Sequence, residues 1–476
     1  MVASLWVVRP AYSSPKVTLS TNRNVPLGLA VNGNSVFVGS SVTTADVVKV
    51  DASTNTLVEG AGLTLAASAG LVALCVDNSA SPATIFAVVD NGASPATVYK
   101  IRQDTMALVG SLALSAGETN PTRIIHNGTY VLVLCGTSPG KLVQINGAPA
   151  TPVRLGALTL GTGEDAPKAI THDGAGNKVY VGCNSTPGRV IKTDVSGGSN
   201  PARVSQLDLA YNHVGALEYG RGYDGYLYAA NGAPAGVGAA AVYQIKPSDM
   251  TVVDSLLAPE ILSDYGWSSM VFDSSSAVSP GRYVYALAYL PTAEGLLYQI
   301  DTGWKGGGLR VSRRFTFDSG YNVSAGSHLA FNGSYLFYPT NESPGRVVKF
   351  YPGALGLVIY PLSESGQSWD RKIIGKIFQP IGADLPISRT YGRNGRAGNL
   401  DHVVRTGVDF DAHYIRTAED EETLALCQPF AFIGDFGPVA VRRSFPAYIG
   451  DIHTDWPFGK HVNHSVLDFD YVEIGI

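Results

Sequence analysis

The last quarter of the chain gathers histidine and aspartate, side chains that commonly bind divalent metal ions. Five of the nine histidines lie after residue 400, and Asp451, His453, His461 and His464 fall within one short stretch. Neutral imidazole and carboxylate groups suit zinc and similar ions. The stretch lacks the helical His-Glu-x-x-His spacing, and a proline and a glycine between the two pairs indicate a loop. A polar, hydrogen-bonded loop or interface is therefore preferred, and we assign no metal and no cofactor.

A glycine-rich, basic segment at residues 391–399 is a second candidate for ligand binding. Its three glycines and two arginines could hold a phosphate group. The segment lacks the Gly-Lys-Ser/Thr ending of a P-loop and the strand-to-helix setting of a dinucleotide site. We therefore favour an exposed loop that contacts a neighbouring subunit.

Nucleophilic chemistry finds little support in the sequence. The cysteines Cys75, Cys135, Cys183 and Cys427 form no Cys-x-x-Cys pair and are predicted to be free thiols, with Cys135 and Cys183 at equivalent, buried positions. No Gly-x-Ser-x-Gly element occurs. We assign no catalytic residue and expect a non-enzymatic protein.

The elements that would position any site are set by an internal repeat. Two β-preferring residues followed by Lys or Gln recur seven times, 44 to 55 residues apart. The Lys and Gln positions are Lys49, Lys100, Gln144, Lys192, Gln244, Gln299 and Lys349. Each copy is preceded by an apolar run that contains Leu29, Leu74, Ile124, Ile170, Leu217, Met270 or Leu329. A repeat of about 50 residues is typical of β-propeller blades.

Within each copy, the pattern predicts strand, tight turn, strand, loop and two further strands. Four of the turns are Asn32-Gly33, Asn127-Gly128, Asp173-Gly174 and Asn332-Gly333. In two-residue hairpins of this kind we expect positive φ at both residues. The fold class is therefore all-β, a seven-bladed β-propeller. We expect residues 16–20 to complete the last blade, with residues 357–360 as the alternative.

The units resemble YVTN/NHL-type β-propeller repeats, as in Leu29-Ala30-Val31-Asn32-Gly33 followed by Val48-Lys49-Val50-Asp51, and the resemblance covers residues 16–352. It implies a propeller fold, with functions from binding platforms to a few lyases. Streptogramin-lyase-like propellers use a His and a Glu at the channel, for which His213, near Glu218, and His328 are candidates. His126 and His172 are expected turn residues. Neighbouring positions are small and inert, so a structural role is preferred: Gly28, Ala30, Ala169, Ala216 and Ala330.

Charge separates the chain into two parts. Residues 361–476 hold 16 acids and 11 bases, whereas residues 1–360 hold 23 of each. The expected organisation is an N-terminal arm at 1–15, the propeller at 16–360 and a small β-rich domain at 361–476. In that domain we expect strands at 372–378, 402–410, 430–433, 439–443 and 465–474, and a helix from Thr417. It loosely resembles β-modules of phage tail and baseplate proteins.

Composition restricts the function. No basic excess favours nucleic acid, no apolar run reaches the about 18–20 residues of a membrane span, and residues 4–8 are too short for a secretory signal. We expect a virion structural protein, assembled in the host cytoplasm, whose 361–476 domain docks to other subunits of a large assembly. Its propeller would be an outward platform for a host-surface ligand. The alternatives are a cell-surface adhesion or carbohydrate-binding propeller and, third, a propeller lyase or hydrolase.

Overall fold

The computed structural model divides the chain into two compact units, Pro15–Phe350 and Met1–Ser14 together with Tyr351–Ile476. It describes these residues: 6–7, 16–21, 23–40, 44–54, 56–67, 70–220, 225–232, 240–257, 266–273, 283–289, 295–302, 308–316, 323, 327–350, 357–359, 373–377, 389–391, 402–404 and 410–412.

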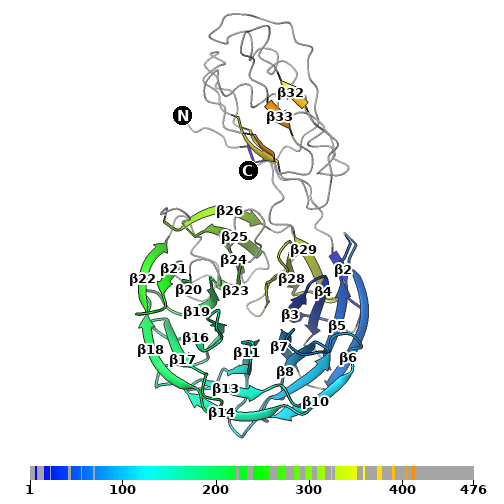
Figure 1. The fold of residues 1–476 in the computed structure, drawn as a ribbon, viewed down its shortest axis with the longest axis vertical. Helices are drawn as coiled ribbons and strands as arrows, with labels where there is room; N and C mark the ends of the chain where they lie inside the picture. The colour runs from blue at the N-terminus through cyan, green and yellow to red at the C-terminus, as the bar shows by residue number, and fades with distance from the viewer. Residues whose placement is uncertain are drawn as a thin grey trace, which may run out of the picture. The chain divides into compact units, whose positions relative to one another are not determined.

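The first unit is a seven-bladed β-propeller, as the repeat predicted (Figure 1). The innermost strands are β3 (Pro26–Asn32), β7 (Gly70–Asp77), β11 (Pro121–His126), β15 (Ala169–His172), β19 (Val214–Tyr219), β23 (Gly266–Phe272) and β27 (Ala330–Phe331). The second strands are β4 (Ser35–Ser40), β8 (Thr84–Asp90), β12 (Val131–Cys135), β16 (Lys178–Cys183), β20 (Leu227–Gly232), β24 (Tyr283–Tyr289) and β28 (Leu336–Thr340).

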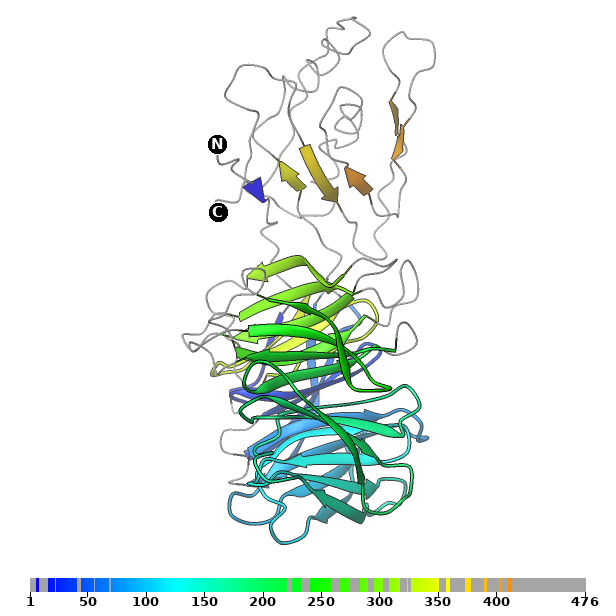
Figure 2. The ribbon, with the colours of Figure 1, turned by 90° about the vertical axis from the view of Figure 1, so that its left-hand side faces the viewer.

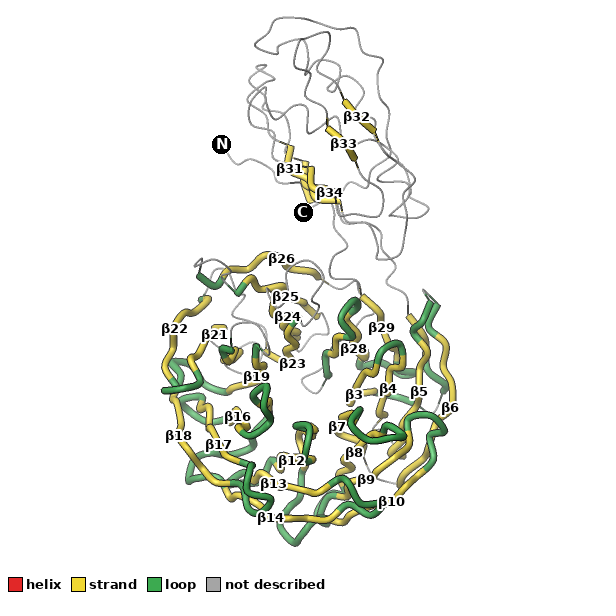
Figure 3. The backbone as a smooth tube through the Cα atoms, viewed as in Figure 1, coloured by secondary structure: helices red, strands yellow, loops and turns green. Residues whose placement is uncertain are grey.

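The third strands carry the repeated Lys or Gln and are β5 (Thr44–Asp51), β9 (Thr97–Arg102), β13 (Lys141–Asn146), β17 (Arg189–Asp194), β21 (Ala240–Lys246), β25 (Gly295–Asp301) and β29 (Arg346–Phe350). The outermost strands are β6 (Val58–Ala67), β10 (Leu108–Ala113), β14 (Val153–Thr159), β18 (Ala202–Asp208), β22 (Thr251–Leu256), β26 (Arg310–Thr316) and β2 (Lys16–Thr18). All strand pairs within the blades are antiparallel, and the tube in Figure 3 shows them arranged around the ring.

The ring closes through its N-terminal strand. Lys16 pairs with Val348 and Thr18 with Arg346, so β2 is the fourth strand of the last blade, as expected. The alternative, closure by residues 357–360, is wrong because β30 (Leu357–Ile359) pairs with β1 (Trp6–Val7) and with β31 (Ile373–Ile377) in the other unit. Both partners of β30 thus satisfy its backbone groups outside the propeller.

The core lies between neighbouring blades, whose sheets face each other (Figure 2). Second strands are buried on both faces; every residue of β12 is fully buried, for example. This explains why they are continuous apolar runs without alternation. At the ring closure, Leu29 and Val36 of the first blade form one cluster with Ala330, Phe337 and Val347 of the last.

The hairpin turns differ from the expected geometry. Gly33, Gly128 and Gly333 have positive φ, but their preceding asparagines do not. Asn127 instead accepts hydrogen bonds at Oδ1 from the N–H groups of Thr129 and Tyr130, at 3.0 and 2.7 Å. In the fourth blade the positive φ falls on Gly176, not Gly174. The expectation of positive φ at both residues was wrong because the asparagine precedes the two-residue loop, and the glycine is the first residue of that loop. Asn32 pairs with Ser35, and the N–H of Asn127 donates to Tyr130 O.

The repeated Lys or Gln on the third strands joins successive blades. In five blades it donates to a backbone carbonyl in the turn between the third and fourth strands of the next blade. These contacts are Lys49 to Gln103 at 3.3 Å, Lys100 to Gly147 at 2.6 Å, Gln144 to Val195 at 3.0 Å, Lys192 to Pro247 at 2.6 Å and Lys349 to Ala52 at 2.9 Å. Gln244 and Gln299 instead donate to Tyr228 and Tyr285 of their own blades. In these five blades the repeated Lys or Gln therefore holds one blade to the next, and we call this contact the latch.

Lys349→Met is expected to lower the free energy of unfolding by about 1.5 kcal/mol, because charged hydrogen bonds to two carbonyls, one of them buried, are lost. Lys349 is 3% exposed, donates to Ala52 and Thr54, and lies over the Tyr335 ring. Lys49→Met is the matched control: its single bond is longer, so we expect about 0.5 kcal/mol. Urea denaturation, monitored by circular dichroism, measures both free energies of unfolding. Equal losses in the two variants would show that the Lys349 contact at the ring closure contributes no more than the Lys49 contact.

The second unit contains an antiparallel sheet in the order β1, β30, β31 and β34 (Phe410–Ala412). A separate pair joins β32 (Arg389–Tyr391) and β33 (His402–Val404). Strands β31 and β33 fall within the predicted strand segments 372–378 and 402–410. The predicted helix from Thr417 and the strands after residue 429 lie outside the described residues. No α-helix occurs in the described part of the chain, and hence none that could span a membrane.

Candidate functional site

The inner strands begin with a recurring irregularity at one end of the ring. The pairing register shifts by one residue after the first pair in β3, β11 and β19, and after the second pair in β7 and β23. Such bulges redirect side chains and are common beside functional sites. Just before four inner strands, Val25, Asn120, Ala166 and His213 all have positive φ, which costs energy for residues other than glycine.

Four basic residues lie at this end of the ring: Arg123 in β11, Lys168 before β15, His213 before β19 and His328 before β27. We call them the basic cluster. The Arg123 charge lowers the pKa of Lys168 and of His328, and the Lys168 charge lowers the pKa of His213. They come from four different blades, so only the closed ring brings them together.

Arg123 is held by two backbone carbonyls. Its Nη1 donates to Thr122 O at 3.1 Å, and its Nη2 donates to Ser268 O at 2.8 Å. Ser268 lies in β23, so this side chain joins the third blade to the sixth. Burial lowers the pKa of Arg123 to about 10, and the guanidinium stays charged at neutral pH.

Blades six, seven and one are joined next to this contact. Ser268 Oγ donates to Ser327 O at 2.5 Å, and the N–H of His328 donates to Leu27 O at 3.2 Å. The His328 side chain is buried, and its Nε2 has no hydrogen-bond partner among the residues that the structure describes. Burial and the Arg123 charge hold the pKa of His328 well below its ordinary value. This histidine is therefore neutral at pH 7.

Lys168 and His213 complete the basic cluster. Burial lowers the pKa of Lys168, and the Arg123 charge acts in the same direction. The pKa of His213 is lowered by burial and by the Lys168 charge, and within the described part of the chain its Nδ1 has no hydrogen-bond partner. Among the described residues, no carboxylate contributes to the pKa shift of any member of this cluster.

The expected His and Glu pair is not brought together. His213 precedes β19, whereas Glu218 lies five residues on, near the other end of that strand. At about 3.3 Å per residue this separates them by about 17 Å along the strand. His126 and His172 end β11 and β15 at the opposite end of the ring. There His126 Nδ1 lies 3.7 Å from Asp77 Oδ1, and His172 Nδ1 contacts Asp173 O at 2.7 Å.

The predicted free thiols are confirmed where the structure describes them. Cys75, Cys135 and Cys183 are buried and unpaired. Burial raises the pKa of Cys135 and of Cys183 to about 12, so both stay protonated at neutral pH. Cys427 lies outside the described residues. So do the metal candidates Asp451, His453, His461 and His464, and all but the first residue of the 391–399 segment.

Sequence reasoning missed Arg123 and Lys168. The repeat itself carried the signal, because Arg123 and His328 occupy the same repeat position, one residue before the apolar anchor. The other copies have a small residue there: Gly28, Ala73, Ala169, Ala216 and Ser269. His328 is among the sequence candidates, whereas Arg123 at the same repeat position is not.

Comparisons with known proteins support the fold alone. No protein-family model and no curated protein matches this sequence. Among solved structures, a chain of the crystal structure of the mitotic checkpoint complex is similar with a TM-score of 0.53 and 11% identity, covering 72% of this chain and 94% of that one. The crystal structure of Sqt1 from Chaetomium thermophilum is similar with a TM-score of 0.50 and 14% identity, covering 70% of this chain and 96% of that one.

Proposed function

We propose that this chain is a non-enzymatic binding platform that holds a partner at the basic cluster of its propeller. The observation that carries the proposal is the cluster itself, which assembles donors and positive charge from four blades. General acid-base chemistry would need a matched acid and base within reach of one substrate atom. The basic cluster offers hydrogen-bond donors and positive charge, which suit binding. His213 and Glu218, the expected acid-base pair, are separated along β19.

A finer proposal concerns where the platform works. We propose that it is a virion component, most simply of a bacteriophage tail or baseplate, whose repeats are of the YVTN/NHL type. In the sequence, residues 1–360 carry no net charge and are followed by an acidic, histidine-rich segment. This difference supports a division of roles, in which the propeller binds a ligand and the later segment docks to other subunits. On this proposal, residues 361–476 dock to other subunits of the assembly, and the propeller faces a ligand on the host surface.

Purified particles test the finer proposal. Particles from cells that produce the chain are separated on a density gradient, cross-linked and analysed by mass spectrometry. We expect the chain at a fixed copy number per particle, with cross-links to other subunits concentrated in residues 361–476. Recovery of the chain only as a free monomer, or only in the cell envelope, would contradict the virion role. Recovery in the envelope would favour the adhesion alternative.

A further inference from the structure

We propose that the basic cluster is a binding site for an oxyanion, a carboxylate or phosphate group that Arg123 and Lys168 hold with His213 and His328 as further donors. The inference deepens the proposed platform by naming the chemistry of its ligand. The oxyanion site itself does not depend on the proposed function. Only the identity of the partner that carries the oxyanion rests on it.

The first argument is that Arg123 is preorganised. Two of its five N–H donors are used by the carbonyls of Thr122 and Ser268, which lie on two different blades. The guanidinium is thereby fixed at the ring centre, and its remaining N–H donors have no partner among the described residues. A fixed guanidinium loses little conformational entropy on binding a planar oxyanion, and its charge strengthens each hydrogen bond.

The second argument is independent of charge and comes from unpaired buried atoms. Buried polar side-chain atoms are nearly always hydrogen-bonded. His328 is 8% exposed, yet its Nε2 has no hydrogen-bond partner in the described ranges. The buried Nδ1 atom of His213 has none there either. An oxyanion beside Arg123 would supply an acceptor for both rings, since each nitrogen can carry a proton in the appropriate tautomer or in the imidazolium form.

The third argument is the missing counter-charge. Arg123 and Lys168 repel each other, and no carboxylate of the described residues offsets either charge. Elsewhere in this propeller, partly buried arginine side chains have acidic partners, as Arg154 has Glu118. A bound oxyanion would remove the repulsion. It would also favour protonation of His213, whose pKa is lowered by burial and the Lys168 charge, and of His328, whose pKa is lowered by burial and the Arg123 charge. Binding should therefore strengthen as the pH falls and these rings take up protons.

Isothermal titration calorimetry on the full chain tests the site with two probes, inorganic phosphate and glutarate, at constant ionic strength. We expect wild type to bind at least one probe with a dissociation constant in the millimolar range or below. Arg123→Gln combined with Lys168→Gln should weaken that binding at least tenfold. Lys246→Gln, which removes an exposed lysine paired with Asp249, is the matched control and should bind as wild type does.

The outcomes separate the sources of the oxyanion. Binding of phosphate alone indicates a phosphate-bearing ligand, binding of glutarate alone indicates a carboxylate-bearing ligand, and binding of both supports a general oxyanion site. The proposal is overturned if wild type binds neither probe at 10 mM, or if the double variant binds as tightly as wild type. Should the double variant fail to fold, His328→Asn replaces it, with the expected loss of the stronger binding at pH 5.5. Particle association is measured separately, so either proposal can fail alone.

Discussion

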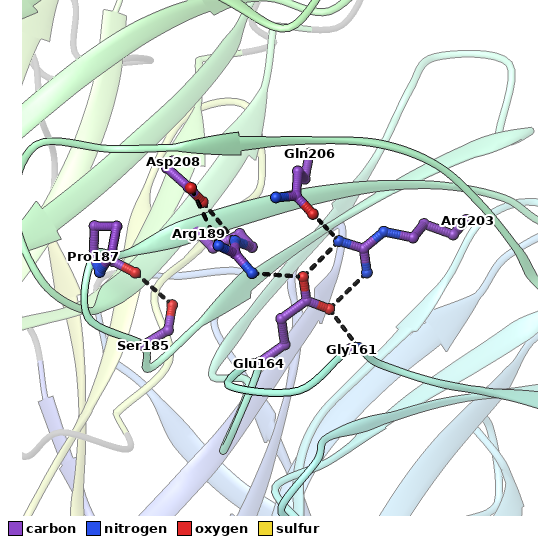
Figure 4. A network of polar contacts seen from close by, with 8 residues as sticks. All are labelled: Gly161, Glu164, Ser185, Pro187, Arg189, Arg203, Gln206 and Asp208. Atoms are coloured by element: carbon purple, nitrogen blue, oxygen red, sulfur yellow. Dashed lines mark hydrogen bonds and ion pairs between the residues drawn. The ribbon is translucent and has the colours of Figure 1, made fainter.

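Replacing Glu164 with glutamine is expected to lower the free energy of unfolding by about 4 kcal/mol. Glu164 is fully buried and accepts hydrogen bonds from both terminal nitrogens of Arg203, at 2.6 and 2.5 Å, and from Arg189 Nη1 at 3.2 Å. The N–H of Gly161 donates to it at 2.6 Å. Figure 4 shows the carboxylate between the two guanidinium groups. The variant would leave two partly buried cations without their shared counter-charge.

The ionised state of Glu164 strengthens this expectation. Burial raises the pKa of this carboxyl, but the hydrogen bonds and charge of Arg203 and the Gly161 N–H outweigh it, and the net pKa is lowered. The carboxylate is therefore charged throughout the neutral range. Its stabilising contribution is present above the unfolded-state pKa near 4.3 and is lost as the pH falls through the folded-state value.

Two matched variants give this prediction its scale. Glu118→Gln removes an equally buried carboxylate that has one arginine partner, Arg154, and should cost about 2 kcal/mol. Asp208→Asn removes an exposed partner of the same Arg189 and should cost less than about 1 kcal/mol. Urea denaturation at pH 7.5 measures all three. A loss in Glu164→Gln no larger than that in Asp208→Asn would show that the buried network contributes little.

The second large effect is a loss of stability in mild acid that His328 causes. Its pKa lies well below the ordinary value in the folded chain, through burial and the Arg123 charge, but near 6.5 in the unfolded chain. Below pH 6.5 the unfolded chain therefore binds a proton that the folded chain does not. While the folded chain keeps His328 neutral, the free energy of unfolding then falls by up to about 1.4 kcal/mol per pH unit below pH 6.5.

Comparison with His328→Asn isolates this proton, because other groups titrate in both proteins. Unfolding is measured by urea denaturation from pH 8 to 5 in buffers without phosphate or carboxylate. We expect the wild-type curve to fall more steeply than that of the variant below pH 6.5, and the two to run parallel above pH 7. Parallel curves over the whole range would mean that the folded chain protonates His328 as readily as the unfolded chain does.

The sequence predicts the ring well because closure depends on periodic features. The seven Lys or Gln positions, the apolar anchors and the fourth strand from residues 16–20 all follow from local patterns that repeat. The sequence alone could not assign the latch, because the acceptors of Lys349 are backbone carbonyls, Ala52 O and Thr54 O, about 300 residues away in the chain.

The basic cluster and the Glu164 network were harder to predict for a different reason. Each is made where single copies depart from the repeat, and a consensus averages such departures away. Arg123 replaces a small residue in one copy, and Glu164 and Glu118 follow a glycine in two similar segments, Gly163-Glu164 and Gly117-Glu118. The hairpin turns failed for a third reason, since the asparagine precedes the two-residue loop, which a dipeptide rule does not foresee.

Pairing of β2 with β29 also sets an order of events during synthesis. The ribosome makes residues 16–18 first, but their partners at 346–348 emerge only after some 330 more residues. At about 5–20 residues per second, this leaves β2 without its strand partner for about 15 to 65 s. A chain interrupted before the seventh blade would leave β2 unpaired and would expose two apolar sheet faces, one at each end of the incomplete ring, against which other chains could pack. These faces are therefore covered only after the seventh blade has been made.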